Sequence, residues 1–382
     1  MRESLDNVSV TTVLYSFETG GSERLGANIA RYLKKRGARS YVCASHGGPG
    51  PVSDLLTEWE VETVMLGNPV TKRLGRMWTL YRHLVKTKCD VLHVHHFNML
   101  VSALVPARLA RVRRIILTEH TDEELQNSPE ARRTARLYGR RVDAISVVHA
   151  GIREFIVSNL GLPANQVVVI PNGVDTDRFQ PRITESEEAA GSRSVNRQKV
   201  IIGCVGRLHS DKDHMNLLKA VRELVHQEVP GFSLFLVGDG AERRALETFV
   251  EEYDLAAHVS FLGERTDVAD LYHTFDIFVL PSKTEGLPIA LLEAMSSGLA
   301  CVATSVGGVP EALKSDAGVV VRPGDWKALA DALGELIQDE DRRNSLGVTA
   351  RKRALTEFDA TRMFSRYESV LLADGGRDAL DP

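Results

Sequence analysis

A chain of 382 residues is long enough for two domains of ordinary size, and its 43% hydrophobic and 26% charged residues are typical of a globular protein. The net charge of -4 gives no reason to expect nucleic acid as a partner. Cys43, Cys89, Cys204 and Cys301 lie far apart in apolar stretches, so we expect buried free thiols in a reducing cytosol. The N-terminus lacks a signal-peptide core and no apolar run could span a bilayer, so we expect a cytoplasmic protein.

Short β-rich runs alternate with longer amphipathic segments in the first half of the chain. The predicted strands are 8–15, 40–44, 61–66, 91–95, 115–118, 144–148 and 167–170. Helices are predicted between them, for example at 23–36 and 78–86. This alternation is typical of a parallel sheet covered by helices.

A polar segment at 182–198 interrupts the pattern, which then starts again. The second set of predicted strands is 200–205, 232–237, 258–262, 277–280, 300–303 and 318–321, with helices such as 214–227 and 242–252. We therefore predict an α/β protein with two Rossmann-like, doubly wound domains, at 1–180 and 199–359. Residues 181–198 are predicted to be a linker or exposed loop, and the C-terminal helical region at 360–382 to pack back on the first domain.

Two loops are candidates for binding phosphate. Gly20 and Gly21 follow the first strand and lead into a helix, where backbone N–H groups can approach an anion. A tight strand-to-helix turn explains these glycines equally well. Arg207 and Lys212 follow the first strand of the second domain and could neutralise a diphosphate without a metal ion. The alternative for this pair is a solvated charged loop.

Two glutamates flank the start of a predicted helix in the second domain. Glu285 follows the strand at 277–280, at the sheet edge where open α/β sheets bind their ligands. Glu293 lies inside a helix that is otherwise apolar, and a buried carboxylate is costly unless something hydrogen-bonds it. The two acids therefore predict a polar ligand site.

Metal binding is the weaker hypothesis for the remaining polar motifs. His93 and His95 share one face of a strand, but a zinc site needs further ligands, so histidines lining a cleft are favoured. His120 follows another strand and could point into the same cleft. The D-x-D tripeptides at 175–177 and 211–213 are common patterns, and a lysine between the second pair of acids would compete with a cation.

The stretch from Arg108 to Arg141 holds nine arginines, no lysine and five acids. A solvated helix face is one explanation. The other is a surface for an anionic membrane or a lipid-phosphate acceptor, which would make the protein peripheral on the inner face of the membrane. Nucleic acid is disfavoured, because Tyr138 is the only aromatic residue there that could stack on bases.

In order and spacing the motifs resemble glycosyltransferase family 4 over nearly the whole chain. They are 20–24, 90–95, 170–175, 206–208 with Lys212, 237–240, 261–263, 281–282 with 285–293, and 304–311. The resemblance implies the GT-B fold, in which two Rossmann-like domains face each other across a cleft. It also implies a retaining, metal-independent hexosyltransferase that takes a UDP- or GDP-linked sugar and needs no other cofactor. The expected acceptor is a glycan or a lipid-linked molecule in cell-surface polysaccharide or glycolipid biosynthesis.

The resemblance also implies roles for residues of the second domain. Glu293 would hold the ribose hydroxyls of the donor, and Glu285 would face the transferred sugar. Arg207 and Lys212 would bind the donor diphosphate. The remaining donor contacts would come from the base-binding Gly263 and Arg265 and from Gly286, Leu287 and Pro288 between the two acids.

For the first domain, the resemblance places Gly20 and Gly21 in a loop that closes over the diphosphate, and His120 near the donor sugar. One departure is Asp213, where many members of the family have glycine. Two alternatives to a transferase stay open. One is a sugar-nucleotide 2-epimerase of the same fold, and the other is a GT-B protein that only binds nucleotide or glycan.

Overall fold

The computed structural model describes residues 5–18, 20–68, 71–182 and 199–373, which belong to two compact units. Unit 1 is Met1–Asn172 with Arg362–Pro382, and unit 2 is Gly173–Thr361. The division falls before residue 180, because Val174 already pairs with Asp359 in a bridge of unit 2. Apart from Pro181 and Arg182, the segment expected as a linker lies outside the described residues.

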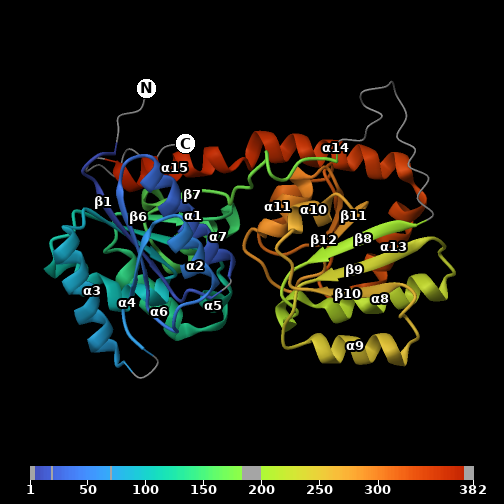
Figure 1. Cartoon of the computed structure of the whole chain (residues 1–382), viewed down its shortest axis with the longest axis horizontal. Helices are drawn as coiled ribbons and strands as arrows, with labels where there is room; N and C mark the ends of the chain where they lie inside the picture. The colour runs from blue at the N-terminus through green and yellow to red at the C-terminus, as the bar shows by residue number, and fades with distance from the viewer. Residues whose placement is uncertain (1–4, 19, 69–70, 183–198, 374–382) are drawn as a thin grey trace. The chain divides into compact units, whose positions relative to one another are not determined.

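Unit 1 contains a seven-stranded parallel sheet with helices on both faces (Figure 1). Its strand order is β3-β2-β1-β4-β5-β6-β7. The strands are β1 (Ser9–Leu14), β2 (Arg39–Ala44), β3 (Glu62–Met65), β4 (Val91–His95), β5 (Arg114–Glu119), β6 (Ala144–Val147) and β7 (Val167–Val169). The helices are α1 (Gly21–Lys35), α2 (Pro51–Glu58), α3 (Arg73–Thr87), α4 (Phe97–Leu109), α5 (Glu123–Asn127), α6 (Pro129–Gly139), α7 (Ala150–Leu160), the short η1 (Ala164–Gln166) and α15 (Ala360–Leu372).

The unit 1 sheet is buried on both faces, which is why its strands are nearly continuous apolar runs. Every residue of β1 is buried. Val10 belongs to the core shared with α1 and α15. The next residue, Thr11, points the other way and lies 3.2 Å from Nε2 of His83 on α3. Helices α1 and α15 therefore cover one face, and α3 covers the opposite one.

The last described helix, α15, completes the core of unit 1. Met363, Tyr367, Val370 and Leu371 pack in the same cluster as β1 and α1. Glu368 fixes the helix in place, because its carboxylate accepts hydrogen bonds from the Tyr32 hydroxyl at 2.6 Å and from Arg36.

Unit 2 contains a six-stranded parallel sheet in the order β10-β9-β8-β11-β12-β13. Its strands are β8 (Val200–Val205), β9 (Phe232–Val237), β10 (Val259–Gly263), β11 (Ile277–Leu280), β12 (Ala300–Thr304) and β13 (Val319–Val321). Its helices are η2 (Ser210–Lys212), α8 (His214–His226), α9 (Arg243–Glu252), α10 (Val268–Tyr272), α11 (Ile289–Ser296), α12 (Val309–Leu313), α13 (Trp326–Gln338) and α14 (Glu340–Glu357).

The sequence predictions of fold class and strands are confirmed. Each predicted strand is present, with ends that differ by at most one residue. The four cysteines are free and buried, as expected, and burial raises the pKa of Cys204 to about 12. Among the described residues, no helix is both long and apolar enough to cross a membrane.

Candidate functional site

In each unit some of the predicted site residues follow the strands at which the sheet order reverses. In unit 1 this point lies between β1 and β4, and in unit 2 between β8 and β11. Gly20 and Gly21 come after β1, and His95 ends β4. Arg207 follows β8 and Glu285 follows β11. Open parallel sheets bind ligands at this topological switch point, so both sets of residues stand where a ligand is expected.

The centre of the unit 2 site is an ion pair between Lys212 and Glu285. Lys212 Nζ lies 2.6 Å from Glu285 Oε1, and the same oxygen accepts a hydrogen bond of 2.7 Å from the Ser282 hydroxyl. The Glu285 side chain is 8% exposed, so its charge needs these partners. The Ser282 carbonyl in turn accepts from the Thr304 hydroxyl at 2.6 Å, which ties the loop to β12.

A glycine holds the loop that carries Glu285 against its neighbour. Gly307 has a φ of +49°, and a Cβ there would lie 2.1 Å from the Glu285 carbonyl oxygen. The next residue, Gly308, donates its N–H to the Gly286 carbonyl at 2.6 Å. This contact requires glycine for both backbone shape and space. Beyond it, Leu287 is buried and Pro288 directly precedes the first residue of α11.

Glu293 has a protein partner that the sequence did not reveal. The Tyr272 hydroxyl lies 3.0 Å from Glu293 Oε2 and 3.0 Å from the Ala290 carbonyl. Tyr272 is fully buried, and burial together with the Glu293 carboxylate raises the pKa of its hydroxyl well above the ordinary value. Glu293 itself is half-buried. The Tyr272 hydroxyl therefore offers this half-buried carboxylate a hydrogen-bond donor within the protein, before any ligand binds.

The other predicted donor contacts lie on neighbouring loops of unit 2. Arg207 is exposed, and its guanidinium has no hydrogen-bond or ion-pair partner among the described residues. Asp213 has a φ of +48°, which explains why glycine suits this position and why aspartate, which tolerates that region, can replace it. Arg265 pairs with the Asp267 carboxylate, with Nε 2.8 Å from Oδ1. Gly263 ends β10 with a φ of +66°.

In unit 1, the two glycines differ in what surrounds them. Gly20 precedes α1 and offers no side-chain cap to the first turn. A Cβ on Gly20 would lie 2.2 Å from the Glu23 carboxylate, which accepts a hydrogen bond from Ser22. A Cβ on Gly21 would meet nothing within 4 Å, so open space lies beside its backbone.

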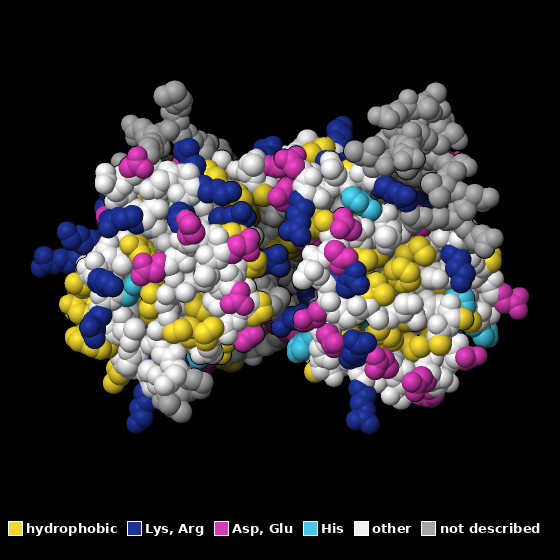
Figure 2. All heavy atoms as spheres, in the orientation of Figure 1, with side chains coloured by type: hydrophobic (Ala, Val, Ile, Leu, Met, Phe, Trp, Pro, Cys, Tyr) yellow, Lys and Arg dark blue, Asp and Glu magenta, His cyan; other side chains and the backbone are white. Residues whose placement is uncertain are grey.

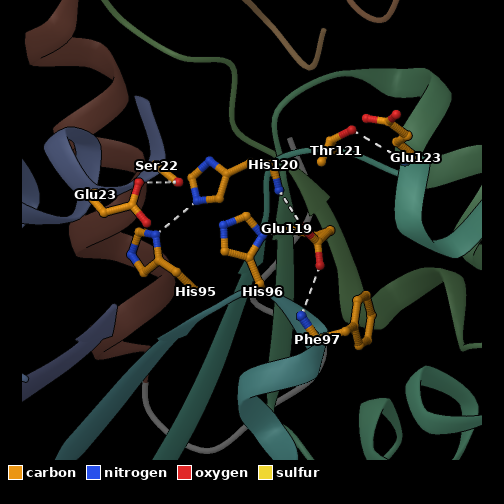
Figure 3. Close-up of polar contacts among 9 residues, drawn as sticks. All are labelled: Ser22, Glu23, His95, His96, Phe97, Glu119, His120, Thr121 and Glu123. Atoms are coloured by element: carbon orange, nitrogen blue, oxygen red, sulfur yellow. Dashed lines mark hydrogen bonds and ion pairs between the residues drawn. The ribbon is translucent and has the colours of Figure 1, made fainter. Parts of the chain in front are cut away.

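His93 and His95 share one face of β4, as predicted, with ring centroids 4.5 Å apart. The expectation that they line a cleft is wrong. Both are fully buried, because His93 lies against Tyr367 of α15 and His95 against Gly26 of α1. His120 is hydrogen-bonded to His95, with its Nε2 2.8 Å from His95 Nδ1 (Figure 3). Burial lowers the pKa of His93 to about 3, and lowers the pKa of His95 and His120 well below the ordinary value.

His96 and Glu119 form a clamp beside His120 that sequence reasoning missed (Figure 3). Glu119 accepts hydrogen bonds from His96 Nδ1 at 2.8 Å and from the backbone N–H groups of Phe97 and His120 at 2.9 and 3.0 Å. Burial opposes the charge on His96, but the carboxylates of Glu119, Glu23 and Glu124 together outweigh it and raise the pKa of His96. His96 also has a φ of +70° and a ψ of 139°, a strained backbone that such a clamp can hold.

The arginine-rich stretch of unit 1 is mostly engaged in structural contacts. Six of its nine arginines donate to backbone carbonyls: Arg108, Arg114, Arg132, Arg136, Arg140 and Arg141. Arg114, for example, reaches Val370 O on α15. Among the described residues, no group of three or more His, Cys, Asp or Glu side chains could hold a metal ion.

Two parallel-sheet units, each with polar residues at its switch point, are the architecture of the GT-B fold, and this is the fold class of the protein. The family model for Glycosyltransferase Family 4 matches residues 19–178, and that for Glycosyl transferases group 1 matches residues 185–353. The chain belongs to glycosyltransferase family 4.

Two relatives and one solved structure illustrate the similarity. The chain is 31% identical over 279 residues to the GDP-mannose-dependent alpha-(1-6)-phosphatidylinositol monomannoside mannosyltransferase of Mycobacterium tuberculosis, covering 70% of this chain and 72% of the relative. It is 25% identical over 338 residues to the UDP-Gal:alpha-D-GlcNAc-diphosphoundecaprenol alpha-1,3-galactosyltransferase of Escherichia coli, covering 85% and 86%. The structure of Anabaena Alr3699/HepE with UDP and glucose matches 96% of this chain and 100% of its own, with a TM-score of 0.81 at 21% identity.

Proposed function

We propose that the protein moves a sugar from a nucleotide-sugar donor to a glycan or lipid-linked acceptor, with retention of anomeric configuration and without a metal ion. The observation that carries this proposal is the Lys212–Glu285 pair at the switch point of unit 2, beside the exposed Arg207. The relatives support the choice of substrates. The names of the two relatives specify a UDP- or GDP-linked sugar, and both of their acceptors carry a lipid.

Each unit 2 residue then has a place along the donor. Arg207 and Lys212 bind the diphosphate, and Glu293, already oriented by Tyr272, accepts from the ribose hydroxyls. Gly263 and Arg265 lie on the loop that we assign to the base. The remaining contacts to the transferred sugar come from Glu285 and from Gly286, Leu287 and Pro288. For unit 1, we assign Gly20 and Gly21 to the diphosphate and His120 to the sugar.

The chemistry follows from where charge develops. As the bond between the anomeric carbon and the phosphate oxygen breaks, negative charge grows on the leaving nucleoside diphosphate. Arg207, Lys212 and backbone amides stabilise that charge. The acceptor hydroxyl attacks the same face that the diphosphate leaves, and its proton passes to a phosphate oxygen. In this scheme Glu285 is not a covalent nucleophile, which would have to lie beneath the anomeric carbon.

A thermal-shift panel tests the donor assignment. UDP, GDP, ADP and their sugars are each added to the protein with and without a chelator, since a ligand that binds the folded state raises its melting temperature. We expect one base to raise the melting temperature regardless of chelator. A response that the chelator abolishes contradicts the metal-free site. The anomeric configuration of the product, read by proton NMR, tests retention.

Incubation of the donor without acceptor tests the class of reaction. A transferase leaves the donor intact or slowly hydrolyses it with the sugar unchanged. Release of a 2-epimerised sugar would show that the protein is an epimerase instead. A protein that binds the donor but acts on no acceptor fits the binding-only alternative.

We also propose that the enzyme is a cytoplasmic protein that works peripherally at the inner face of a membrane, where a lipid-linked acceptor is presented. The sequence pointed to the stretch from Arg108 to Arg141 as the contacting surface. Most arginines of this stretch are hydrogen-bonded to backbone carbonyls. The stretch as a whole is therefore a weaker candidate for membrane contact than a face that exposes cations and apolar side chains side by side.

A further inference from the structure

The exposed apolar side chains of unit 1 gather on two neighbouring helices. On α3, Leu74 is 77% exposed, Trp78 60% and Val85 49%. On α4, Val105 is 51% exposed and Leu109 67%. These five are half of the ten large hydrophobic side chains that are exposed among the described residues. A concentration of this kind on a soluble surface marks an interaction site rather than ordinary scatter.

The helical spacing puts the α3 side chains in one row. Positions 74, 78, 82 and 85 are separated by four, four and three residues, so they lie on the same face of the helix. Arg82 therefore stands in the same row as Leu74 and Trp78. Such a face, with an aromatic residue, aliphatic residues and arginine, is typical of helices that lie in a lipid–water interface.

Helices α3 and α4 form one surface rather than two. They pack against each other, and the Arg73 guanidinium on α3 donates to the Val101 carbonyl on α4 at 3.0 Å. Figure 2 shows hydrophobic side chains along the outer edge of unit 1 over α3, with Lys and Arg side chains beside them.

The charge of this region is strongly biased. Residues 72–118, which contain α3 and α4, hold ten lysines and arginines and a single acid, whereas the whole chain has a net charge of -4. One of the ten, Arg114, is buried and donates to Val370 on the opposite face of the sheet, so nine cations remain for this region. The single acid, Asp90, lies outside both helices and accepts the Ser9 N–H at 2.9 Å. No acid stands in the first turn of α3, so the positive end of the helix dipole adds to Lys72 and Arg73. The surface complements an anionic partner.

We propose that α3 and α4 form the face with which the protein lies on an anionic phospholipid bilayer. Leu74 and Trp78 enter the headgroup region, and Arg82, Lys86 and their neighbours bind lipid phosphates. The proposal rests on the proposed function, because a lipid-linked acceptor is presented at such a surface. A second copy of the chain is a poor occupant, since a symmetric contact would bring the same cations together.

Vesicle flotation tests the proposal with the full-length protein. We expect binding to vesicles of phosphatidylcholine mixed with phosphatidylglycerol, little binding to phosphatidylcholine alone, and weaker binding at high salt. The double variants Leu74→Ser/Trp78→Ser and Arg82→Gln/Lys86→Gln should each lower the partition coefficient at least about tenfold. Tryptophan emission should shift to the blue on vesicle binding in the wild type, and clearly less in Trp78→Phe.

Two matched controls use exposed residues elsewhere. Val348→Ser, on α14 of unit 2, removes a side chain that is 64% exposed, and Arg133→Gln removes an exposed charge of α6 from the arginine-rich stretch. Both should leave flotation unchanged. Wild-type protein that fails to float, α3 variants that float normally, or equal loss in Arg133→Gln would each overturn the proposal.

The thermal-shift response to nucleotide separates this inference from the proposed function. Variants that lose vesicle binding but keep the wild-type response to UDP or GDP support the membrane face and leave the donor site intact. A wild-type protein that floats but responds to no nucleotide or nucleotide sugar contradicts the proposed function and leaves the membrane face standing. By size-exclusion chromatography, we expect these variants to have the same oligomeric state as the wild type. A wild-type dimer that these variants dissociate would instead assign the face to a second copy of the chain.

Discussion

His95 Nδ1 lies 2.8 Å from His120 Nε2, so one proton between these two atoms couples the tautomers of both rings. Both rings are neutral near pH 7, because burial lowers the pKa of each. The far nitrogen of His95, Nε2, is buried without a hydrogen-bond partner among the described residues. An unpaired acceptor is tolerated more often than an unpaired N–H, which favours donation from His95 Nδ1. His120 then carries its own proton on Nδ1.

Substitution of His95 tests this coupling. His95→Asn keeps an amide N–H near the position of Nδ1, whereas His95→Leu leaves His120 Nε2 without its donor. We expect the leucine variant to lose about 1–3 kcal/mol of unfolding free energy and the asparagine variant less. The nitrogen-15 shifts of His120 should report the Nδ1–H tautomer in the wild type and the asparagine variant, and a mixture in the leucine variant. Identical spectra in all three would contradict the assignment.

The buried histidines make the protein sensitive to acid. The native pKa of His93 is about 3, against about 6.5 in the unfolded chain, so the unfolded state binds more protons between these values. His93 therefore costs about 1.4 kcal/mol of stability per pH unit as the pH falls below about 6.5. His96, whose pKa is raised, acts with the opposite sign: its contribution is present at low pH and is lost as the pH rises through its native pKa.

Urea unfolding of His93→Phe at pH 7 and pH 5 checks this acid sensitivity. The wild type should lose about 2 kcal/mol more than the variant between the two pH values, because only the wild type must leave His93 neutral in the folded state. Phenylalanine keeps an aromatic ring at this position, where the centroid of the His93 ring lies 5.8 Å from that of Tyr367. If both proteins lose the same stability, the assignment of His93 as neutral and buried in the folded state is wrong.

The Lys212–Glu285 pair predicts a selective loss of activity. In Lys212→Ala, Glu285 keeps the Ser282 hydroxyl but loses its cation, and the leaving diphosphate loses one of two side-chain charges. We expect turnover to fall by about 10²–10³-fold. The matched control is Lys283→Ala, since Lys283 is 57% exposed and pairs with Asp213. Similar losses in both variants would mean that the charge of the loop, not this pair, matters.

The sequence predicted the fold well because the periodicity of apolar residues is a local property. Strand after strand appears where a short apolar run lies between polar turns. The hydrogen-bond partners within the sites were harder to predict. Tyr272 reaches Glu293 from another helix, and Glu119 reaches back to His96 across 23 residues, so neither contact leaves a local pattern. The burial of His93 also escaped prediction, because it depends on Tyr367 of α15 from the far end of the chain.

Two glycine substitutions should separate the need for a particular loop conformation from the need for space beside the bound donor. Gly307→Ala places a Cβ against the Glu285 carbonyl, so we expect the loop to shift and both stability and turnover to fall. Gly21→Ala meets no neighbouring atom and lies at the start of α1, so stability should be unchanged or rise by up to about 1 kcal/mol. If the proposed diphosphate contact is right, donor KM rises in Gly21→Ala. Thermal melts and initial rates measure both effects.

The return of α15 to the first sheet has a consequence for biosynthesis. Met363, Tyr367 and Leu371 complete the core of unit 1, yet they are translated after all of unit 2. The synthesis of unit 2 can therefore be complete while unit 1 still lacks one of the helices that cover its sheet. His93 of β4 stays open to water until that helix arrives, so the first part of the protein to be made is the last to close.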